Sequence, residues 1–381
     1  MQNADAKTAN IHDVVIVGAG AAGIGMAMAL KNIPSLHYTI LERERIGESF
    51  RGWPAQTKFI TPSFNSNSFG LADLNAVDAS SSPAKFSGSE HLSGSQYAEY
   101  LSFIADSAKL DVMCGVEVQD VYPGQLGGFR LFTEQGEINT RFLIWACGEY
   151  QFPDLEPFTG GKLCLHYAQV DDWSKLQSGH YSVIGGYESA IDAAFNLLKQ
   201  GHSVRLLIRQ PTWDTPEISD PSLVLSPYSR ERLRLIEASD KLEIVSQADI
   251  VEVSKKTANG FRIHAADGRH WDTIEPPVLG TGFMSGGGAR QIAHLWQWGN
   301  NGHVKLSEID ESTITPGLFL IGPQVRQNKL IYCFIYKFRQ RFAAIASEIS
   351  HRLMIDSVTA NDSENAWGPF GNTECCEDCE C

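Results

Sequence analysis

The sequence lacks any apolar run near the ~20 residues that a membrane-spanning helix requires. Its first residues, MQNADAKTANIHD, are polar and contain no apolar signal stretch. Basic residues are few, because 31 Lys and Arg stand against 45 Asp and Glu, and the formal net charge is −14. Such a charge disfavours binding to nucleic acid. We therefore expect a cytoplasmic protein with no membrane or nucleic-acid partner, long enough for two domains.

Cysteine is also sparse, and it is unevenly placed. The chain has eight cysteines, of which Cys114, Cys147, Cys164 and Cys333 are scattered singly. The others crowd the segment 375–381, as Cys375, Cys376, Cys379 and Cys381. With no signal stretch, such clustering indicates metal or redox chemistry more than structural disulfides.

Two glycine-rich turns each connect a short apolar run to a helix-like segment. The first is Gly18-Ala19-Gly20-Ala21-Ala22-Gly23, and it leads to a strand-like segment that ends at Glu42. The second is Gly185-Gly186-Tyr187-Glu188-Ser189-Ala190, and it leads at the same spacing to Arg209. Both read as a strand, a helix and a strand, which is the unit that binds dinucleotides. Glu42 and Arg209 stand at equivalent positions and have opposite charges, which indicates that one protein binds two different dinucleotides.

The first turn has the residues that a pyrophosphate site needs. Gly18 allows the tight bend, Gly20 lets the backbone approach the phosphates, and Gly23, beyond Ala22, allows close packing of helix on strand. The helix N-terminus supplies free N–H groups and a positive dipole. Glu42 is suited to accept hydrogen bonds from a ribose diol. We expect FAD at this site.

The second turn is degenerate, because Tyr187 stands where a third glycine often occurs. Ser189 and Ala190 keep the start of the helix small. Arg209, with Arg205 on the same face of the strand, suits a 2′-phosphate, which an acid would repel. We therefore expect NADPH in preference to NADH at a site formed by Gly185, Gly186, Glu188, Ser189 and Ala190; two solvated arginines are the alternative.

The order of these units predicts an α/β protein with two Rossmann-like, three-layer βαβ dinucleotide-binding domains. The NADPH domain (166–269) would be inserted into a discontinuous FAD domain (11–165 and 270–355), followed by an acidic, Cys-rich tail (356–381). Residues 47–95 are expected to form loops over a cofactor, 243–252 a strand, and 328–354 one long helix.

The motifs resemble those of two-dinucleotide-binding flavoproteins, in particular the flavin-containing monooxygenase-like and bacillithiol-disulfide-reductase-like branches. The resemblance covers residues 11–350 approximately, and it is carried by GAGAAG (18–23), Glu42, Ala146-Cys147-Gly148 with Pro153, VIGGYESAIDAA (183–194) and TPGLFLIG (315–322). It implies an FAD enzyme that takes hydride from NADPH. Gly148 would lie in the linker turn, Trp53 beside the isoalloxazine, and Gly322 and Pro323 at the ribityl chain. A homodimer is expected from the fold.

The sequence departs from these families in three places. Many relatives carry Asp where Pro323 stands, so ribityl binding must use other groups. The monooxygenase pattern F-x-G-x3-H is not met, because five residues separate Gly160 from His166. No Cys-x-x-Cys precedes residue 376 and the segment 47–53 has no cysteine, so the redox dithiols of related reductases are missing from their usual places.

The cysteine tail has three interpretations. In the first, the tail is a redox relay that carries electrons from the flavin to a disulfide or another thiol-linked acceptor, either a small molecule or a protein; fully extended, 356–381 spans ~80 Å. In the second, the tail is a soft-metal site, although four ligands so close together are tight for one zinc ion. In the third, the thiols of the tail do nothing essential. We expect an FAD-dependent NAD(P)H oxidoreductase with a redox tail and assign no metal ligand; monooxygenase-like oxygenation of a soft nucleophile, or a flavoprotein with a metal-binding tail, are the alternatives.

Overall fold

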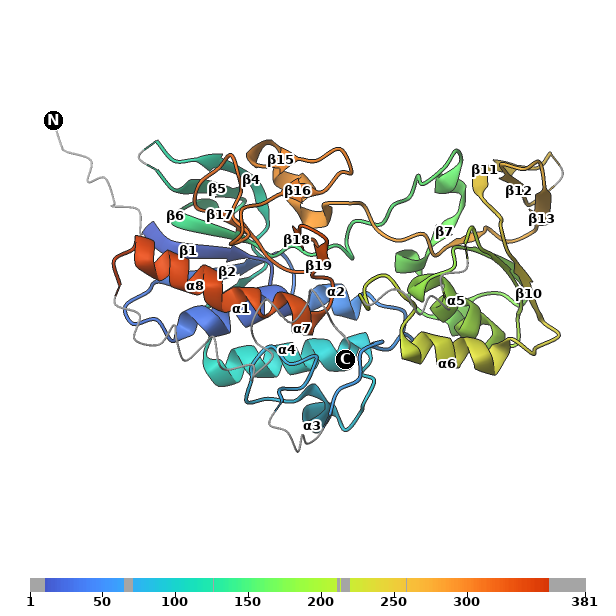
Figure 1. The fold of residues 1–381 in the computed structure, drawn as a ribbon, viewed down its shortest axis with the longest axis horizontal. Helices are drawn as coiled ribbons and strands as arrows, with labels where there is room; N and C mark the ends of the chain where they lie inside the picture. The colour runs from blue at the N-terminus through green and yellow to red at the C-terminus, as the bar shows by residue number, and fades with distance from the viewer. Residues whose placement is uncertain are drawn as a thin grey trace.

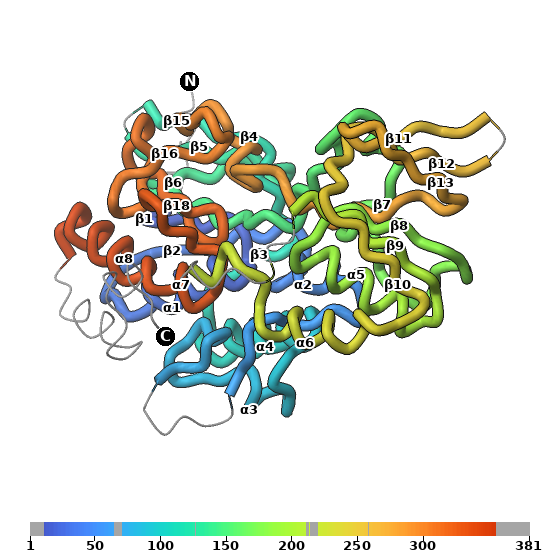
Figure 2. The backbone as a smooth tube through the Cα atoms, turned by 45° about the vertical axis from the view of Figure 1, so that its right-hand side comes forward, coloured from blue at the N-terminus to red at the C-terminus, as the bar shows by residue number. Residues whose placement is uncertain are grey.

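The computed structural model describes residues 11–64, 71–125, 127–210, 213, 220–257 and 259–355. Two α/β units lie side by side, each around its own largely parallel sheet (Figure 1). The chain leaves the first unit after β6, builds the second, and returns after β14 (Figure 2). The expected α/β class with two Rossmann-like βαβ units is thereby confirmed. The tail cysteines Cys375, Cys376, Cys379 and Cys381 lie outside the described residues.

The first unit contains a seven-stranded sheet of order β3-β2-β1-β6-β5-β4, with β17 also paired to β6. Strands β1, β2, β3, β6 and β17 are parallel to their partners, whereas β4, β5 and the first half of β6 form an antiparallel extension. The strands are β1 (Ile11–Val17), β2 (Tyr38–Glu42), β3 (Val112–Cys114), β4 (Val118–Pro123), β5 (Phe129–Thr133), β6 (Gly136–Trp145) and β17 (Leu318–Leu320). The carboxyl ends of β1, β6 and β17 therefore meet at one edge.

Helices cover one face of this sheet, where α1, α4 and α8 lie together (Figure 1). α1 is rich in small apolar residues, and nearly all of it is buried. α4 begins with a capping box between Ser93 and Gln96, and it ends at Lys109 in the left-handed conformation. The helices of this unit are α1 (Ala21–Lys31), α2 (Glu48–Arg51), α3 (Pro83–Ser87), α4 (Gly94–Ala108), α7 (Ile335–Phe338) and α8 (Arg341–Arg352).

The second unit has a five-stranded parallel sheet of order β10-β9-β8-β14-β7 and a separate antiparallel sheet of order β11-β12-β13. Its elements are β7 (Leu165–His166), β8 (His180–Ile184), α5 (Glu188–Lys199), β9 (Ser203–Leu207), α6 (Pro227–Ile236), β10 (Leu242–Val245), β11 (Ile250–Lys255), β12 (Phe261–Ala265), β13 (His270–Thr273) and β14 (Val278–Leu279). Because β7, β13 and β14 pair here, the unit extends beyond the expected boundaries of 166–269.

Two expected elements differ in the structure. The single helix expected at 328–354 is instead a hairpin of β18 (Arg326–Gln327) and β19 (Leu330–Ile331), followed by α7 and α8. Asn328 has φ of +53°, a turn conformation that interrupts a helix. The strand expected at 243–252 is divided into β10 and β11, with Gln247 between them at φ of +56°. A second hairpin, β15 (Gln297–Trp298) and β16 (Val304–Lys305), was not anticipated.

A buried ion pair ties α8 to the loop before β17. Arg341 Nε donates to Asp310 Oδ2 at 2.8 Å, and Gln327 Nε2 donates to Asp310 Oδ1 at 2.6 Å. The Asp310 side chain is fully buried and that of Arg341 is 8 % exposed. The ion pair therefore fixes the loop before β17 against α8, and the bond from Gln327 ties the segment after β17 to the same carboxylate.

Replacing Arg341 by Met should lower the free energy of unfolding by about 3–5 kcal/mol, because Asp310 would keep a buried charge without its cation. Urea-induced unfolding measures this. The matched control is Arg45→Met, which removes an Arg from the exposed pair with Glu48 and should change stability little. Equal stability of the two variants would contradict the assignment.

Candidate functional site

A continuous cavity of about 670 Å³ reaches from the first glycine turn to the second. Three parts of the chain line it: the carboxyl edge of the first sheet, the second turn with α5, and the segment that follows β17. The lining includes Gly18, Gly20, Ala22, Glu42, Trp53, Gly148, Glu149, Tyr187, Glu188, Ser189, Asp192, Pro323, Arg326 and Cys333. Of the residues predicted from the two turns, Gly18, Gly20, Ala22, Glu188 and Ser189 line this space, whereas Gly23, Gly185, Gly186 and Ala190 do not.

The first turn packs tightly between β1, α1 and the end of β6. A Cβ at Gly18, whose φ is +103°, would lie 2.7 Å from the Ala146 carbonyl oxygen, and a Cβ at Gly23 would lie 1.9 Å from that of Gly18. A Cβ at Gly20 would meet no atom within 4 Å, because this residue faces the cavity. Packing therefore requires Gly18 and Gly23, whereas Gly20 leaves open space beside the N-terminus of α1, as a bound phosphate needs.

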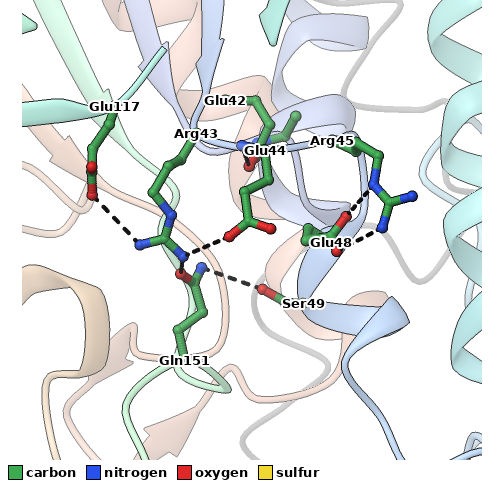
Figure 3. A network of polar contacts seen from close by, with 9 residues as sticks. Glu42, Arg43, Glu44, Arg45, Glu48, Ser49, Glu117 and Gln151 are labelled. Atoms are coloured by element: carbon green, nitrogen blue, oxygen red, sulfur yellow. Dashed lines mark hydrogen bonds and ion pairs between the residues drawn. The ribbon is translucent and has the colours of Figure 1, made fainter. Parts of the chain in front are cut away.

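Glu42 ends β2 at the same edge of the cavity (Figure 3). Its carboxylate accepts from the backbone N–H of Ala19 at 2.8 Å and of Glu44 at 2.9 Å. The next residue, Arg43, pairs with Glu117 at 3.7 Å and donates to Gln151 at 2.6 Å (Figure 3). These contacts fix the Glu42 carboxylate between the first turn and a polar rim, which suits a ribose diol.

The second turn repeats this packing with different residues. A Cβ at Gly185, whose φ is +132°, would lie 2.3 Å from the Gly280 carbonyl oxygen, and one at Gly186 would lie 2.5 Å from Ile208 Cγ2. At Gly280, beyond β14, a Cβ would lie 2.7 Å from Ala190. The close approach of helix and strand thus needs Gly280 opposite Ala190 as well as the glycines of the turn.

Tyr187 and Glu188 hold the chain that covers the second turn. The Tyr187 hydroxyl donates to the carbonyl oxygen of Val224 at 2.5 Å. The Glu188 carboxylate accepts from Ser226 N at 2.6 Å and from Ser229 Oγ at 2.5 Å, at the start of α6. Burial raises the pKa of Glu188, and these donors partly offset the increase. Glu188 lines the cavity, but its carboxylate is held by hydrogen bonds from Ser226 and Ser229 of the second unit.

The two candidate phosphate ligands differ in position. Arg205 lies within β9 and donates to Glu243 on β10 at 2.7 Å, away from the cavity lining. Arg209 lies beyond the carboxyl end of β9 and is exposed. Neither arginine lines the cavity. That the two arginines bind one 2′-phosphate therefore stays a prediction, and Arg209 is the one that lies at the carboxyl edge of the sheet.

An aromatic group forms the wall expected beside the flavin ring. Trp53 and Phe50 both line the cavity, with ring centroids 5.3 Å apart. Phe59 lies 4.9 Å from Trp53, and Tyr97 lies 4.5 Å from Phe59. Such offset packing gives Trp53 a fixed orientation.

Buried polar contacts join the two units at the cavity. The Asp192 carboxylate on α5 accepts from Thr57 Oγ1 at 2.8 Å and from the Tyr167 hydroxyl at 2.6 Å, and it pairs with Arg232. Burial first, and then the Asp192 charge, raise the pKa of Tyr167, so this phenol is a donor. Because Thr57 belongs to the first unit, Asp192 anchors the second unit against it.

A second contact crosses between the units at the chain segment that covers the second turn. Lys337 on α7 donates to Asp220 at 2.6 Å and to Ser222 Oγ at 2.8 Å. Ser222 Oγ in turn donates to the Ile331 carbonyl oxygen at 3.3 Å. The Lys337 side chain is 7 % exposed, so this link is nearly dry. The chain over the second turn is thereby fastened to the first unit.

Gly322 and Pro323 follow β17, where the ribityl chain was expected. Gly322 has φ of +98°, and a Cβ there would lie 3.2 Å from Ala22 Cβ. Pro323 lines the cavity and offers no side-chain hydrogen bond. Gly148, with φ of +62°, lines it from the end of β6.

The cysteines of the described residues form no dithiol. Cys147 Sγ lies 3.7 Å from the Val17 carbonyl oxygen, and burial raises its pKa. Cys333 lines the cavity, and burial raises its pKa too. Burial raises the pKa of Cys164 to about 12. His166 bonds through Nε2 to the Gly282 carbonyl oxygen at 2.9 Å and accepts at Nδ1, which is a structural role.

The described residues contain no group of three or more His, Cys, Asp or Glu placed to hold a metal ion. Among these same residues, no helix combines the length and apolar character needed to cross a bilayer.

Sequence reasoning missed several residues of the site. Asp192 sits in the middle of an apolar helix (AIDAAFNLL) and Lys337 in an apolar run (LIYCFIYKF), and a charge in such a setting is a signal of a buried partner. Glu149 directly follows the Ala146-Cys147-Gly148 linker motif. Their partners lie far away in the sequence, so only the fold could name them.

The cavity suits a dinucleotide with a flat ring at one end. It offers a glycine cradle, a carboxylate for a ribose, and an aromatic wall along one continuous space. Residues 15–322 match the family model described as pyridine nucleotide-disulphide oxidoreductase. The chain belongs to this family. The protein is an FAD-dependent pyridine nucleotide oxidoreductase.

The individual relatives have low sequence identity to this chain. A ferredoxin–NADP reductase of Lacticaseibacillus paracasei is 25% identical over 265 residues, which cover 67% of this chain and 76% of that protein. Another, of Mesorhizobium japonicum, is 26% identical over 51% of this chain and 56% of its own length. Bacillithiol disulfide reductase from Staphylococcus aureus superposes with TM-score 0.71 at 20% identity, covering 90% of this chain and 98% of that one. A flavin-containing monooxygenase from Stenotrophomonas maltophilia gives 0.68 at 16% identity, with the same two coverages.

Replacing Gly20 by Ala should weaken FAD binding at least tenfold without changing the stability of the apoprotein. The added methyl group meets no protein atom but occupies the space that the pyrophosphate needs. Titration of apoprotein with FAD, together with thermal unfolding, separates the two effects. The control is Gly18→Ala, which should destabilise the apoprotein itself through the Ala146 contact. Wild-type FAD affinity in Gly20→Ala would contradict this placement of the phosphates.

Proposed function

We propose that the protein is an FAD-dependent NADPH oxidoreductase that reduces a disulfide or another thiol-linked acceptor. One observation carries the proposal: the two glycine turns border the same cavity, so a dinucleotide at each would place both reacting rings in one space. FAD, when bound, supplies two-electron hydride chemistry. The chain supplies binding, orientation and exclusion of water.

Each part of the cavity has a role in this scheme. The first turn and the N-terminus of α1 bind the FAD pyrophosphate, and Glu42 holds its adenosine ribose. Trp53 and Phe50 form the wall for the ring. The second turn binds the NADPH pyrophosphate, and Arg209 neutralises the 2′-phosphate. The contacts of Asp192 and Lys337 keep the two sites aligned.

The acceptor side depends on the cysteine tail. Cys147 and Cys333 line the cavity singly, and neither forms a pair beside the aromatic wall. Electrons would therefore leave through Cys375, Cys376, Cys379 and Cys381, within one chain or across a homodimer. The family description and the fold shared with bacillithiol disulfide reductase support a disulfide or thiol acceptor.

A second candidate is a one-electron carrier protein, as the names of the ferredoxin–NADP reductase relatives indicate. It is favoured by the lack of a dithiol among the described residues, since such transfer needs none. Monooxygenase-like oxygenation is a further alternative, and only the similarity of the fold to a flavin-containing monooxygenase supports it. A metal-binding tail is another alternative.

Replacing Arg209 by Gln should raise KM for NADPH about ten- to a hundred-fold and leave KM for NADH unchanged, because one charge-assisted bond to the 2′-phosphate is lost. Arg205→Gln is the matched control, and it should change neither value because Arg205 is paired with Glu243. Steady-state kinetics with both nucleotides measures this. A larger effect of Arg205→Gln than of Arg209→Gln would reverse the assignment.

Replacing all four tail cysteines by Ser should leave reduction of the flavin by NADPH intact and abolish reduction of a disulfide substrate. Anaerobic titration with NADPH, with counts of electrons and free thiols, makes the comparison. Cys333→Ser is the control and should retain turnover. If the four-fold Ser variant reduces disulfides at the wild-type rate, the relay is excluded; if the wild-type protein and this variant both reduce a one-electron dye and neither reduces a disulfide, the carrier alternative is favoured.

A further inference from the structure

A partly buried carboxyl group lies where two neighbouring parallel strands of the first sheet, β6 and β17, end. Glu149 follows Gly148 beyond β6, and Gln324 follows Pro323 beyond β17. These strands are parallel neighbours, with Leu320 opposite Trp145. Gln324 Nε2 donates to Glu149 Oε2, and Gln324 Oε1 accepts from Gly286 N at 2.8 Å. Glu149 is thus oriented by an amide that is itself anchored.

The Glu149 carboxyl accepts a hydrogen bond from Gln324 at one oxygen. Burial raises its pKa, and the nearby Arg326 and the bond from Gln324 offset this only in part. Arg326 Nη1 instead donates to the carbonyl oxygens of Pro323 and Val325, at 2.6 and 2.8 Å. Among the described residues, no hydrogen bond or ion pair reaches Glu149 Oε1. This oxygen is therefore an acceptor that a ligand in the cavity can reach.

The open side of Glu149 faces the cavity between the two ends of the proposed flavin site. Glu149 lines the cavity. The segments on either side of it contact the first turn: Ala146 at Gly18, and Gly322 at Ala22. Trp53 lies further along the same space. A ligand that runs from the first turn to the aromatic wall must pass this carboxyl group.

The carboxyl oxygen of Glu149 limits the chemistry of the part of the ligand that passes it. A phosphate would be repelled by a carboxylate, and an apolar ring edge would leave it unsatisfied. A chain of hydroxyl groups, each a donor, satisfies it. In FAD the ribityl chain is the polyol between the pyrophosphate and the ring.

We propose that Glu149, oriented by Gln324, accepts hydrogen bonds from the ribityl hydroxyls of FAD, in place of the side chain that Pro323 cannot provide. This inference rests on the proposed placement of FAD in the first turn. Glu149 is a positioning residue: it sets where the ring lies against Trp53, and it takes no part in hydride transfer.

The test compares FAD with ADP, which shares the adenosine and pyrophosphate but has no ribityl chain. Glu149→Ala apoprotein should bind FAD about ten- to a hundred-fold more weakly and bind ADP with wild-type affinity. Glu149→Gln, which keeps an acceptor oxygen, should show a smaller loss. Glu237→Gln, an exposed change in the second unit, is the control and should match the wild type. Fluorescence titration measures binding, and thermal unfolding of each apoprotein verifies the fold.

Equal weakening of FAD and ADP, or no change in either, would overturn the role of Glu149. So would a rise in KM for NADPH with unchanged FAD affinity, which would place the carboxyl at the nicotinamide ribose. Failure of the wild-type protein to bind FAD would instead overturn the proposed function. If the wild type binds FAD and Gly20→Ala weakens it while Glu149→Ala does not, only the inference about Glu149 fails.

Discussion

The structure depends on the close approach of backbone to backbone at the two glycine turns. Gly18 lies against Ala146, and Gly185 lies against Gly280, at distances that leave no room for a Cβ. Each contact brings the end of the first strand of a βαβ unit against the end of the neighbouring parallel strand. The start of each helix is thereby placed over the carboxyl edge of its sheet, which is where ligands bind in open α/β sheets. The cavity between the units follows from having two such edges face each other.

Polar contacts between the units then fix the relative orientation of the carboxyl edges of the two sheets. Asp192 accepts a hydrogen bond from Thr57, and Lys337 forms an ion pair with Asp220. Both are largely dry, and breaking such a contact leaves a buried charge unpaired. The relation of the two units is therefore set by specific pairs, in addition to apolar packing within each unit. Alignment of donor and flavin would depend on these pairs as much as on the turns.

Much of the first site could be predicted from local sequence, because its determinants are consecutive. The spacing from Gly18 to Glu42 encodes a strand, a helix and a strand, and the structure has all three. Side-chain alternation places Arg205 and Arg209 on one face, but it could not show that Arg205 pairs with Glu243 on the neighbouring strand. The single helix expected at 328–354 does not form, because the pairing of β18 with β19, rather than local helix propensity, sets the turn at Asn328.

Other features depend on contacts between distant parts of the chain. Glu149 and Gln324 are adjacent only because β6 and β17 are neighbours in the sheet, and Asp192 meets Thr57 only because the units dock. No periodicity or motif contains that information. The same limit applies to the domain boundaries, since β7 and β14 are two-residue strands that only sheet pairing assigns.

The central claim is that one cavity holds the flavin and the nicotinamide in contact. Anaerobic stopped-flow mixing of FAD-loaded protein with NADPH, and with NADPH deuterated at the transferred position, tests it most directly. The account predicts rapid loss of flavin absorbance with a primary isotope effect. Binding of NADPH without loss of flavin absorbance would contradict it.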